Sequence, residues 1–199
     1  MQLVLASSSP YRRALLEQLR LPFHCASPDI DETPLPGETV SALVERLALA
    51  KARALGGAYP EALIIGSDQA CALDGRILGK PGNFANAKTQ LLACSGRSLV
   101  FHTGLALFDA RNQRWQHSLD TYTVQFRKLS AAEIVYYLEQ EQPFDCAGSF
   151  KVEGLGITLF SALEGQDFNS LIGLPLLNLC AMLRTAGLNP LAPDSSAPD

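Results

Sequence analysis

The chain contains no apolar run that approaches the roughly 18 residues needed by a membrane-spanning helix. Its short apolar start is not preceded by a basic segment, which argues against a secretory signal. Positive charge is also scarce, because 16 Lys and Arg stand against 20 Asp and Glu and leave a formal net charge of -4. The chain therefore offers no general basic field for a nucleic-acid backbone. We expect a cytoplasmic protein without membrane or nucleic-acid partners.

Signatures of zinc sites and of disulfide frameworks are missing as well. The five cysteines are widely spaced among apolar residues and form no CxxC pair, and the three histidines are scattered without metal-ligand spacing. An odd number of isolated cysteines predicts reduced thiols in the core, and we assign no catalytic role to the histidines. The cysteines are Cys25, Cys71, Cys94, Cys146 and Cys180.

Strand and helix patterns alternate along the chain and predict an α/β fold with a mixed sheet. They favour one domain over residues 1–191, followed by a tail at 192–199 without apolar pattern that is expected to be disordered. The expected helices are 10–20, 40–55, a helix after Asn83, a helix from Ser130 to near Gln140, and 175–185. The expected strands lie around Val4 and Leu5 and at 23–26, 62–65, 99–108 and 115–126.

A serine-rich junction, residues 7–13, follows the first strand. Ser9 is placed to cap the next helix, and Pro10 suits its first position. A helix start presents free N–H groups and the positive end of its dipole, so it favours an anion such as phosphate. The hydroxyls of Ser7 and Ser8 and an arginine, Arg12 or Arg13, would add donors there. The alternative is a well-capped helix whose arginines are merely solvated.

Four further polar residues lie at positions where they could bind a ligand. Lys51 continues an apolar helical stripe, so it must either extend to solvent or meet an anion. Asp68 is expected at or near the end of a buried strand, where α/β sheets bind ligands, or in an Asx turn. Glu32 lies in a loop restricted by prolines, and Lys80 precedes a proline.

Together these groups indicate the cleavage of a phosphoanhydride. Glu32 and Asp68 offer hard oxygen ligands of the kind that Mg²⁺ or Mn²⁺ prefers, and Co²⁺ is a further candidate for the divalent cofactor. One carboxylate could deprotonate a water while the cations stabilise charge on the phosphates.

The chain resembles the Maf family of nucleotide pyrophosphatases in a series of motifs that occur in order over nearly its whole length. These motifs are residues 7–13, Asp31-Glu32, Lys51, residues 66–69, Gly79-Lys80-Pro81, residues 146–154 and Gly173-Leu174-Pro175. The resemblance implies an elongated, two-lobed, ITPase-like α/β fold with a cleft between the lobes, and a homodimer. It also implies metal-dependent hydrolysis of a nucleoside triphosphate.

The resemblance further implies roles for single residues. Asp68 matches the proton acceptor of the family and, with Glu32, the metal-site carboxylates. The residues that match phosphate contacts are Ser7, Arg12, Lys51 and Lys80.

Three positions resemble the branch of the family that acts on 7-methyl-GTP rather than the branch that acts on dTTP and UTP. They are Tyr11, Gln69 and Glu153. Tyr11 could stack on the cationic 7-methylguanine base, with a cation-π contribution of roughly 0.5–2 kcal/mol. Glu153 could accept hydrogen bonds from guanine, or it could instead pair with Lys151 or Arg127 and never contact the base.

The expected activity is hydrolysis of 7-methyl-GTP to 7-methyl-GMP and diphosphate, which would remove modified nucleotides from the pool. Two alternatives remain open. One is a pyrophosphatase for another non-canonical nucleotide, and the other is a nucleotide-binding regulator of septum formation.

Overall fold

The computed structural model describes residues 1–192, so 193–199, most of the predicted tail, lie outside the described residues. The contacts within the chain divide it into two compact units. Unit 1 comprises residues 1–69, 103–120 and 167 onward, and unit 2 comprises 70–102 and 121–166. The expectation of a single domain over 1–191 stays a prediction.

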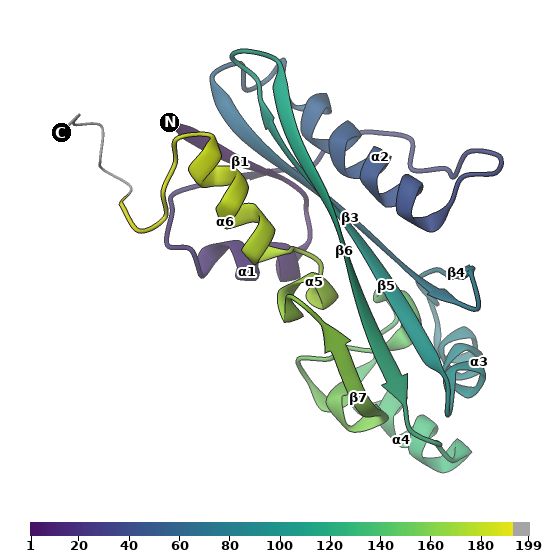
Figure 1. The fold of residues 1–199 in the computed structure, drawn as a ribbon. Helices are drawn as coiled ribbons and strands as arrows, with labels where there is room; N and C mark the ends of the chain where they lie inside the picture. The colour runs from purple at the N-terminus through teal and green to yellow at the C-terminus, as the bar shows by residue number, and fades with distance from the viewer. Residues whose placement is uncertain (193–199) are drawn as a thin grey trace. The chain divides into compact units, whose positions relative to one another are not determined.

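One mixed sheet of seven strands runs through the described chain in the order β2-β1-β3-β5-β6-β7, with β4 paired to β3 (Figure 1). β1 is parallel to β2 and β3, whereas β4 and β7 pair antiparallel with their neighbours. The predicted mixed α/β fold is therefore confirmed. The strands are β1 (Gln2–Ala6), β2 (His24–Ala26), β3 (Ala62–Leu73), β4 (Arg76–Leu78), β5 (Ser98–Asp109), β6 (Arg114–Phe126) and β7 (Phe160–Gly165).

Three helices begin at the predicted capping residues Ser9, Asn83 and Ser130, and the helix that begins at Val40 has a cap at Thr39 that was not predicted. Side chains of Ser9, Thr39 and Asn83 each accept a hydrogen bond from the first turn that follows, and Ser130 with Glu133 forms a complete capping box. The helices are α1 (Pro10–Glu17), α2 (Val40–Ala54), α3 (Phe84–Cys94), α4 (Ala131–Glu141), α5 (Phe168–Ile172) and α6 (Leu176–Thr185). Short 3₁₀ turns, η1 (Ala147–Ser149) and η2 (Leu155–Leu159), lie in unit 2. α1 ends at Glu17 rather than near the predicted residue 20, and Arg20 adopts a positive φ of 55°.

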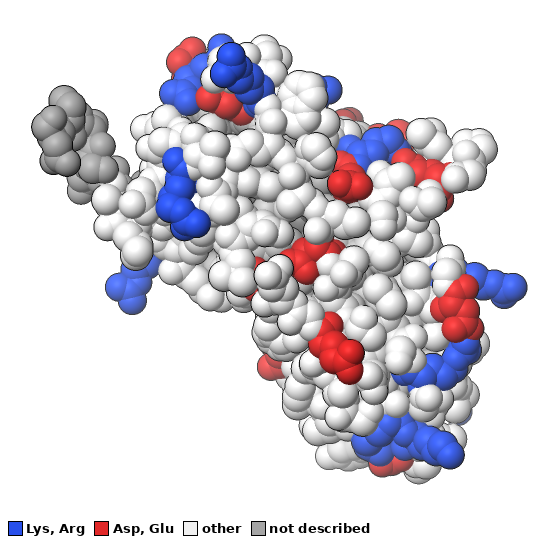
Figure 2. All heavy atoms as spheres, viewed as in Figure 1, with Lys and Arg blue, Asp and Glu red and all other residues white. Residues whose placement is uncertain are grey.

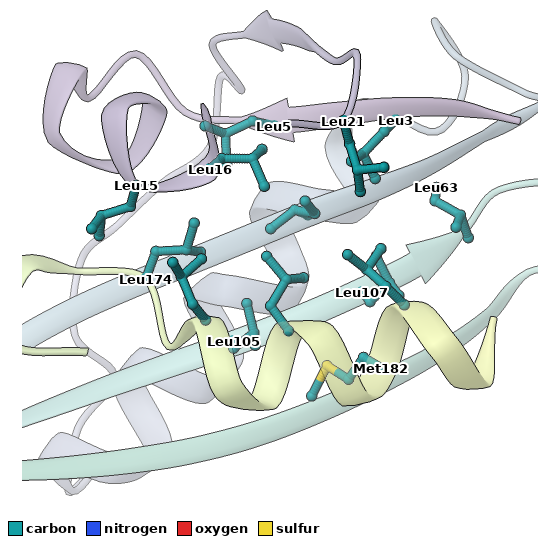
Figure 3. Packing of buried hydrophobic residues seen from close by; sticks show 14 residues of the cluster. Leu3, Leu5, Leu15, Leu16, Leu21, Leu63, Leu105, Leu107, Leu174 and Met182 are labelled. Atoms are coloured by element: carbon teal, nitrogen blue, oxygen red, sulfur yellow. The ribbon is translucent and has the colours of Figure 1, made fainter. Parts of the chain in front are cut away.

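The core of unit 1 has two layers because the central strands are buried on both faces. In β1, Leu3 and Leu5 pack in one cluster with residues of α1, β5 and α6 (Figure 3), whereas Val4 and Ala6 pack in another with Ala52 of α2. Side chains alternate between the faces of a strand, so neighbouring residues fill opposite layers. β1 is therefore covered by α1 and α6 on one face and by α2 on the other.

The core of unit 2 is built around aromatic rings. Phe150 makes edge-to-face contacts with Phe101, Phe126 and Phe160, with ring centroids 4.8–5.8 Å apart. Such contacts favour the edge of one ring against the face of another. Tyr137 of α4 is also buried in this unit, and its hydroxyl accepts a hydrogen bond from the backbone N–H of Lys151 at 3.0 Å.

β3 is longer than the sequence predicts, and this corrects the expected position of Asp68. The strand does not end at Ile65 but continues to Leu73, so Asp68 lies in its interior rather than at its end or in an Asx turn. α2 approaches this strand closely at Gly66, where an added Cβ would collide with the carbonyl oxygen of Ala48. Asp68 pairs with Lys51 of α2, whereas its neighbours Ser67 and Gln69 bond to the carbonyl oxygens of Gly173 and Ser170. Each polar side chain in this part of the strand therefore has a partner.

Candidate active site

The serine-rich junction folds as a tight entry into α1. Ser7 is buried, and its hydroxyl accepts a hydrogen bond from the N–H of Ser9 at 3.1 Å. Ser9 in turn accepts from the N–H of Arg12 at 3.3 Å, while Ser8 is exposed. The predicted cap is confirmed. Ser7 acts there as an acceptor, so its own hydrogen can still be donated to another group.

Two neighbouring arginines of α1 have different environments. Arg13 is exposed and pairs with Glu17 at 3.0 Å, whereas Arg12 is half-buried and its Nε donates to the carbonyl oxygen of Gly173 at 2.9 Å. Burial lowers the pKa of Arg12, and the charges of Asp68 and Glu32 partly offset this effect. Arg12 is therefore the arginine on the side of the carboxylates. Of the two arginines left open by the sequence, it is the candidate for the phosphates.

A buried lysine joins two carboxylates in unit 1. The Lys51 ammonium lies 2.6 Å from Asp68 Oδ1 and 2.8 Å from Glu32 Oε1. Lys51 and Asp68 are 7% and 8% exposed, whereas the Glu32 side chain is 58% exposed. Lys51 thus meets anions, as one of the two interpretations of its stripe predicted, and does not extend to solvent.

Gly104 of β5 helps to bring this cluster together. An added Cβ there would collide with the backbone of Val44 in α2, just as one at Gly66 would collide with Ala48. Two glycines on adjacent strands therefore let α2 lie close against the sheet. This close approach brings Lys51 of the helix within hydrogen-bonding distance of Asp68 on β3.

The amide nitrogen of Gln69 forms its hydrogen bonds with groups of the protein itself. Nε2 lies 2.7 Å from the carbonyl oxygen of Ser170, 3.1 Å from that of Leu171 and 3.0 Å from Thr103 Oγ1. Only the NH₂ group can face two carbonyl acceptors, so the orientation of this amide is determined by its partners. Gln69 Oε1 is the remaining polar atom that could meet a ligand.

The segment that follows α5 is held by hydrogen bonds from β3 and from α1. The hydroxyl of Ser67 lies 2.9 Å from the carbonyl oxygen of Gly173, which also accepts from Arg12 Nε. Gly173 has a φ of 124°, a conformation that favours glycine. The sequence analysis assigned no role to Ser67 or Thr103 and did not predict α5. Ser67 and Gly173 nevertheless lie in two of the motifs that resemble the Maf family, residues 66–69 and Gly173-Leu174-Pro175. A five-residue helix is too short to give a periodic signal.

Lys80 and Glu153 lie in unit 2, and both are exposed. The ion pairs considered for Glu153 are not formed: Lys151 Nζ donates to the carbonyl oxygen of Glu141 at 3.2 Å, and Arg127 pairs with Glu133 at 2.8 Å. The roles of Lys80 at the phosphates and of Glu153 at the base remain predictions.

The donor set of unit 1 is compatible with a divalent cation. Within residues 1–192 no three His, Cys, Asp or Glu side chains are grouped so that they could hold a metal ion alone. Mg²⁺ is commonly bound by only one or two carboxylates together with waters and substrate phosphates. Glu32 and Asp68 converge on one positive charge, that of Lys51, and so form a place where cationic charge is stabilised.

The charged surface agrees with the low positive charge of the sequence. On the face in Figure 2, lysines and arginines occur in separate groups, and acidic residues lie near some of these groups. None of the helices in residues 1–192 is both long and apolar enough to span a membrane.

Solved structures resemble this α/β architecture. The Ham1 protein of Staphylococcus aureus matches with a TM-score of 0.53 at 15% identity, over 94% of this chain and all of that chain. A HAM1 protein from Coxiella burnetii has a TM-score of 0.47 at 18% identity, over 77% of this chain and 88% of its own. The Staphylococcus structure supports a Ham1-like α/β fold.

Sequence comparison defines the family. The family model described as Maf-like protein matches residues 2–186. A protein of Chromohalobacter salexigens named 7-methyl-GTP pyrophosphatase is 57% identical over 190 residues, which cover 96% of this chain and 98% of that protein. The chain therefore belongs to the Maf-like protein family.

Proposed function

We propose that this protein is a nucleoside triphosphate pyrophosphatase that hydrolyses 7-methyl-GTP to 7-methyl-GMP and diphosphate. The observation that carries the proposal is the buried Lys51–Asp68 pair, with the Glu32 carboxylate on the same ammonium. Burial lowers the pKa of the Arg12 guanidinium, and the negative charges of Asp68 and Glu32 act in the opposite direction. The name of the Chromohalobacter relative, at 57% identity, supports the choice of substrate.

In the proposed reaction, α1 and the side chains around its start bind the phosphates. Ser7, with Ser8 beside it, can donate a hydroxyl hydrogen, and the free guanidinium nitrogens of Arg12 can donate to phosphate oxygens. The Lys51 ammonium, which binds the two carboxylates, can also interact with the incoming phosphates. These cationic groups stabilise the charge that develops on the leaving diphosphate. Lys80 is proposed as a further phosphate contact.

Asp68 is proposed as the proton acceptor. A water oxygen forms the new bond to phosphorus, the anhydride bond between the α- and β-phosphoryl groups breaks, and the proton of the water passes to Asp68. The electron pair of the broken bond leaves with the diphosphate. A divalent cation, Mg²⁺, Mn²⁺ or Co²⁺, held by Glu32 and Asp68, would supply neutralisation of phosphate charge when bound.

Base selection is proposed to depend on three residues. Tyr11 would stack on the positively charged base, where an arginine would repel it. Glu153 would accept hydrogen bonds from guanine, whereas the carbonyl oxygens of uracil or thymine would face its negative charge unfavourably. Gln69 would act through Oε1 or through the carbonyl groups of Ser170 and Leu171 that it holds.

The test is a diphosphate-release assay with 7-methyl-GTP, GTP, ITP, UTP and dTTP, each with Mg²⁺, Mn²⁺ and Co²⁺. We expect 7-methyl-GTP to give the highest kcat/KM, and Asp68→Asn to reduce kcat to background. Asp109→Asn removes a carboxylate of β5 in unit 1 that pairs with Arg111, and serves as the matched control that keeps activity. Equal efficiency with UTP would contradict the assignment of substrate.

We also propose that the enzyme acts in the cytoplasm as a homodimer on a small-molecule nucleotide, without nucleic-acid or membrane partners. Within the described residues 1–192, which include all five cysteines, none of them forms a disulfide, and this suits a reducing compartment. Light scattering coupled to gel filtration should give twice the chain mass of 21.4 kDa.

A further inference from the structure

The loop that carries Glu32 is bound to α2 by an arginine in addition to the Lys51–Glu32 ion pair. Arg46 Nε lies 2.6 Å from Glu38 Oε1, and its NH2 lies 2.8 Å from Glu38 Oε2. The same NH2 donates to the carbonyl oxygen of Thr33 at 3.2 Å. Arg46 therefore holds both ends of the segment from Thr33 to Glu38. Paired hydrogen bonds between a guanidinium and a carboxylate fix orientation as well as distance.

Glu38 connects this ion pair to the backbone of the loop. Its Oε2 accepts from the N–H of Leu35 at 3.0 Å, and its own N–H donates to the carbonyl oxygen of Leu35 at the same distance. The Glu38 side chain is only 7% exposed, although most of the surrounding loop is exposed. The carboxylate of Glu38 thus connects the backbone of the loop to Arg46 of α2.

Glu32 itself has little packing that could hold it. Its side chain is 58% exposed and forms an ion pair with Lys51. Thr33, whose carbonyl oxygen is bound by Arg46, is the next residue in the chain. Arg46 and Lys51 lie on the same helix, so the helix that supplies the ammonium also anchors the loop beside it.

We propose that Arg46, through Glu38 and the carbonyl group of Thr33, is a positioning residue that holds Glu32 beside Lys51 and Asp68. The inference rests on the proposed function in one respect, namely that Glu32 serves the nucleotide site. The hydrogen bonds of the Arg46 guanidinium go to Glu38 and Thr33 and not to Glu32, so Arg46 positions Glu32 through the loop. Residues that orient metal-site ligands typically change metal affinity or activity by about 10–100-fold when they are removed.

The experiment compares Arg46→Met with Glu32→Gln and with the double variant. We expect Arg46→Met to lower kcat/KM for 7-methyl-GTP at least about tenfold and to raise the Mn²⁺ concentration needed for half-maximal activity. The double variant should be no worse than Glu32→Gln alone, because Arg46 acts through Glu32. Fully additive losses would overturn the inference.

A second measurement does not depend on activity. Hydrogen exchange of the segment 33–38 should accelerate in Arg46→Met and in the isosteric Glu38→Gln, which is the variant to use if Arg46→Met folds poorly. The matched control is Arg111→Met, which removes an equally paired arginine of unit 1, with distances of 2.9 and 2.8 Å to Asp109. It should leave both exchange of this segment and activity unchanged.

The outcomes separate this inference from the proposed function. Faster exchange of the loop with unchanged kcat/KM would overturn the positioning role while leaving the activity in place. A wild-type protein that releases no diphosphate from any nucleotide contradicts the proposed function before a variant is compared. Exchange of the loop in the same protein would still report whether Arg46 holds it.

Discussion

Lys51 illustrates how much the position of a single residue can indicate. A lysine on an apolar helical stripe has to reach either water or an anion, and local spacing poses this choice without deciding it. The anions prove to be Asp68 and Glu32, which come from a strand and a loop outside α2. Removing one member of such a buried group leaves the others with unbalanced charge, which is commonly costly. Asn keeps the shape of the Asp68 side chain but not its charge, so Asp68→Asn removes the proposed proton acceptor and also carries the cost of this imbalance.

The hydrogen bonds of Gln69 allow a second test on a single residue. Gln69→Ala removes the donor to the carbonyl groups of Ser170 and Leu171, so these acceptors lose a buried partner. We expect the free energy of unfolding, measured in urea, to fall by about 1–3 kcal/mol. Gln125→Ala, which removes an exposed bond to Glu164, should cost less than Gln69→Ala. Equal losses in the two variants would contradict the structural role of Gln69.

Elements with local signals were predicted well, and those without them were not. The caps at Ser9, Asn83 and Ser130 require only residues a few positions away, and all three are confirmed. The predicted length of β3 was wrong because the polar side chains in its middle have partners far along the chain, which local patterns do not encode. The partners of Gln69 lie 34, 101 and 102 residues away along the chain, so no spacing rule could have found them.

The capping box of α4 allows a prediction of pH dependence. Hydrogen bonds from the N–H and hydroxyl groups of Ser130, with Arg127, lower the pKa of Glu133 from 4.5 to about 2. A carboxyl group whose pKa is lower in the folded state stabilises the fold above its unfolded pKa, and this contribution is lost as pH falls from about 4.5 toward 2. The stability difference between wild type and Glu133→Gln should therefore be largest near neutral pH.

Urea unfolding at pH 7, 4 and 3 measures this difference. It should shrink steadily as the pH falls through this range. Glu139→Gln, on the same helix but away from its N-terminus, controls for the loss of a surface charge. A difference between wild type and Glu133→Gln that stays constant over this range would rule out the lowered pKa as its cause.

At the scale of the whole molecule, the described chain consists of two units with different kinds of core. Unit 1 packs aliphatic side chains on both faces of its central strands, whereas unit 2 centres on phenylalanine rings. The cluster of Lys51, Asp68 and Glu32 and the guanidinium of Arg12 all belong to unit 1. Ligands bound by that cluster should therefore stabilise unit 1 directly.

Thermal unfolding of Asp68→Asn with and without nucleotide tests this expectation, because the variant should bind 7-methyl-GTP without consuming it. A ligand at about 100 times its Kd adds about 2.7 kcal/mol to the stability of the state that binds it. For a chain of this size that corresponds to a rise in Tm of about 5–10 °C. UTP at the same concentration should give a much smaller shift. Equal shifts with the two nucleotides would show that the site does not distinguish their bases.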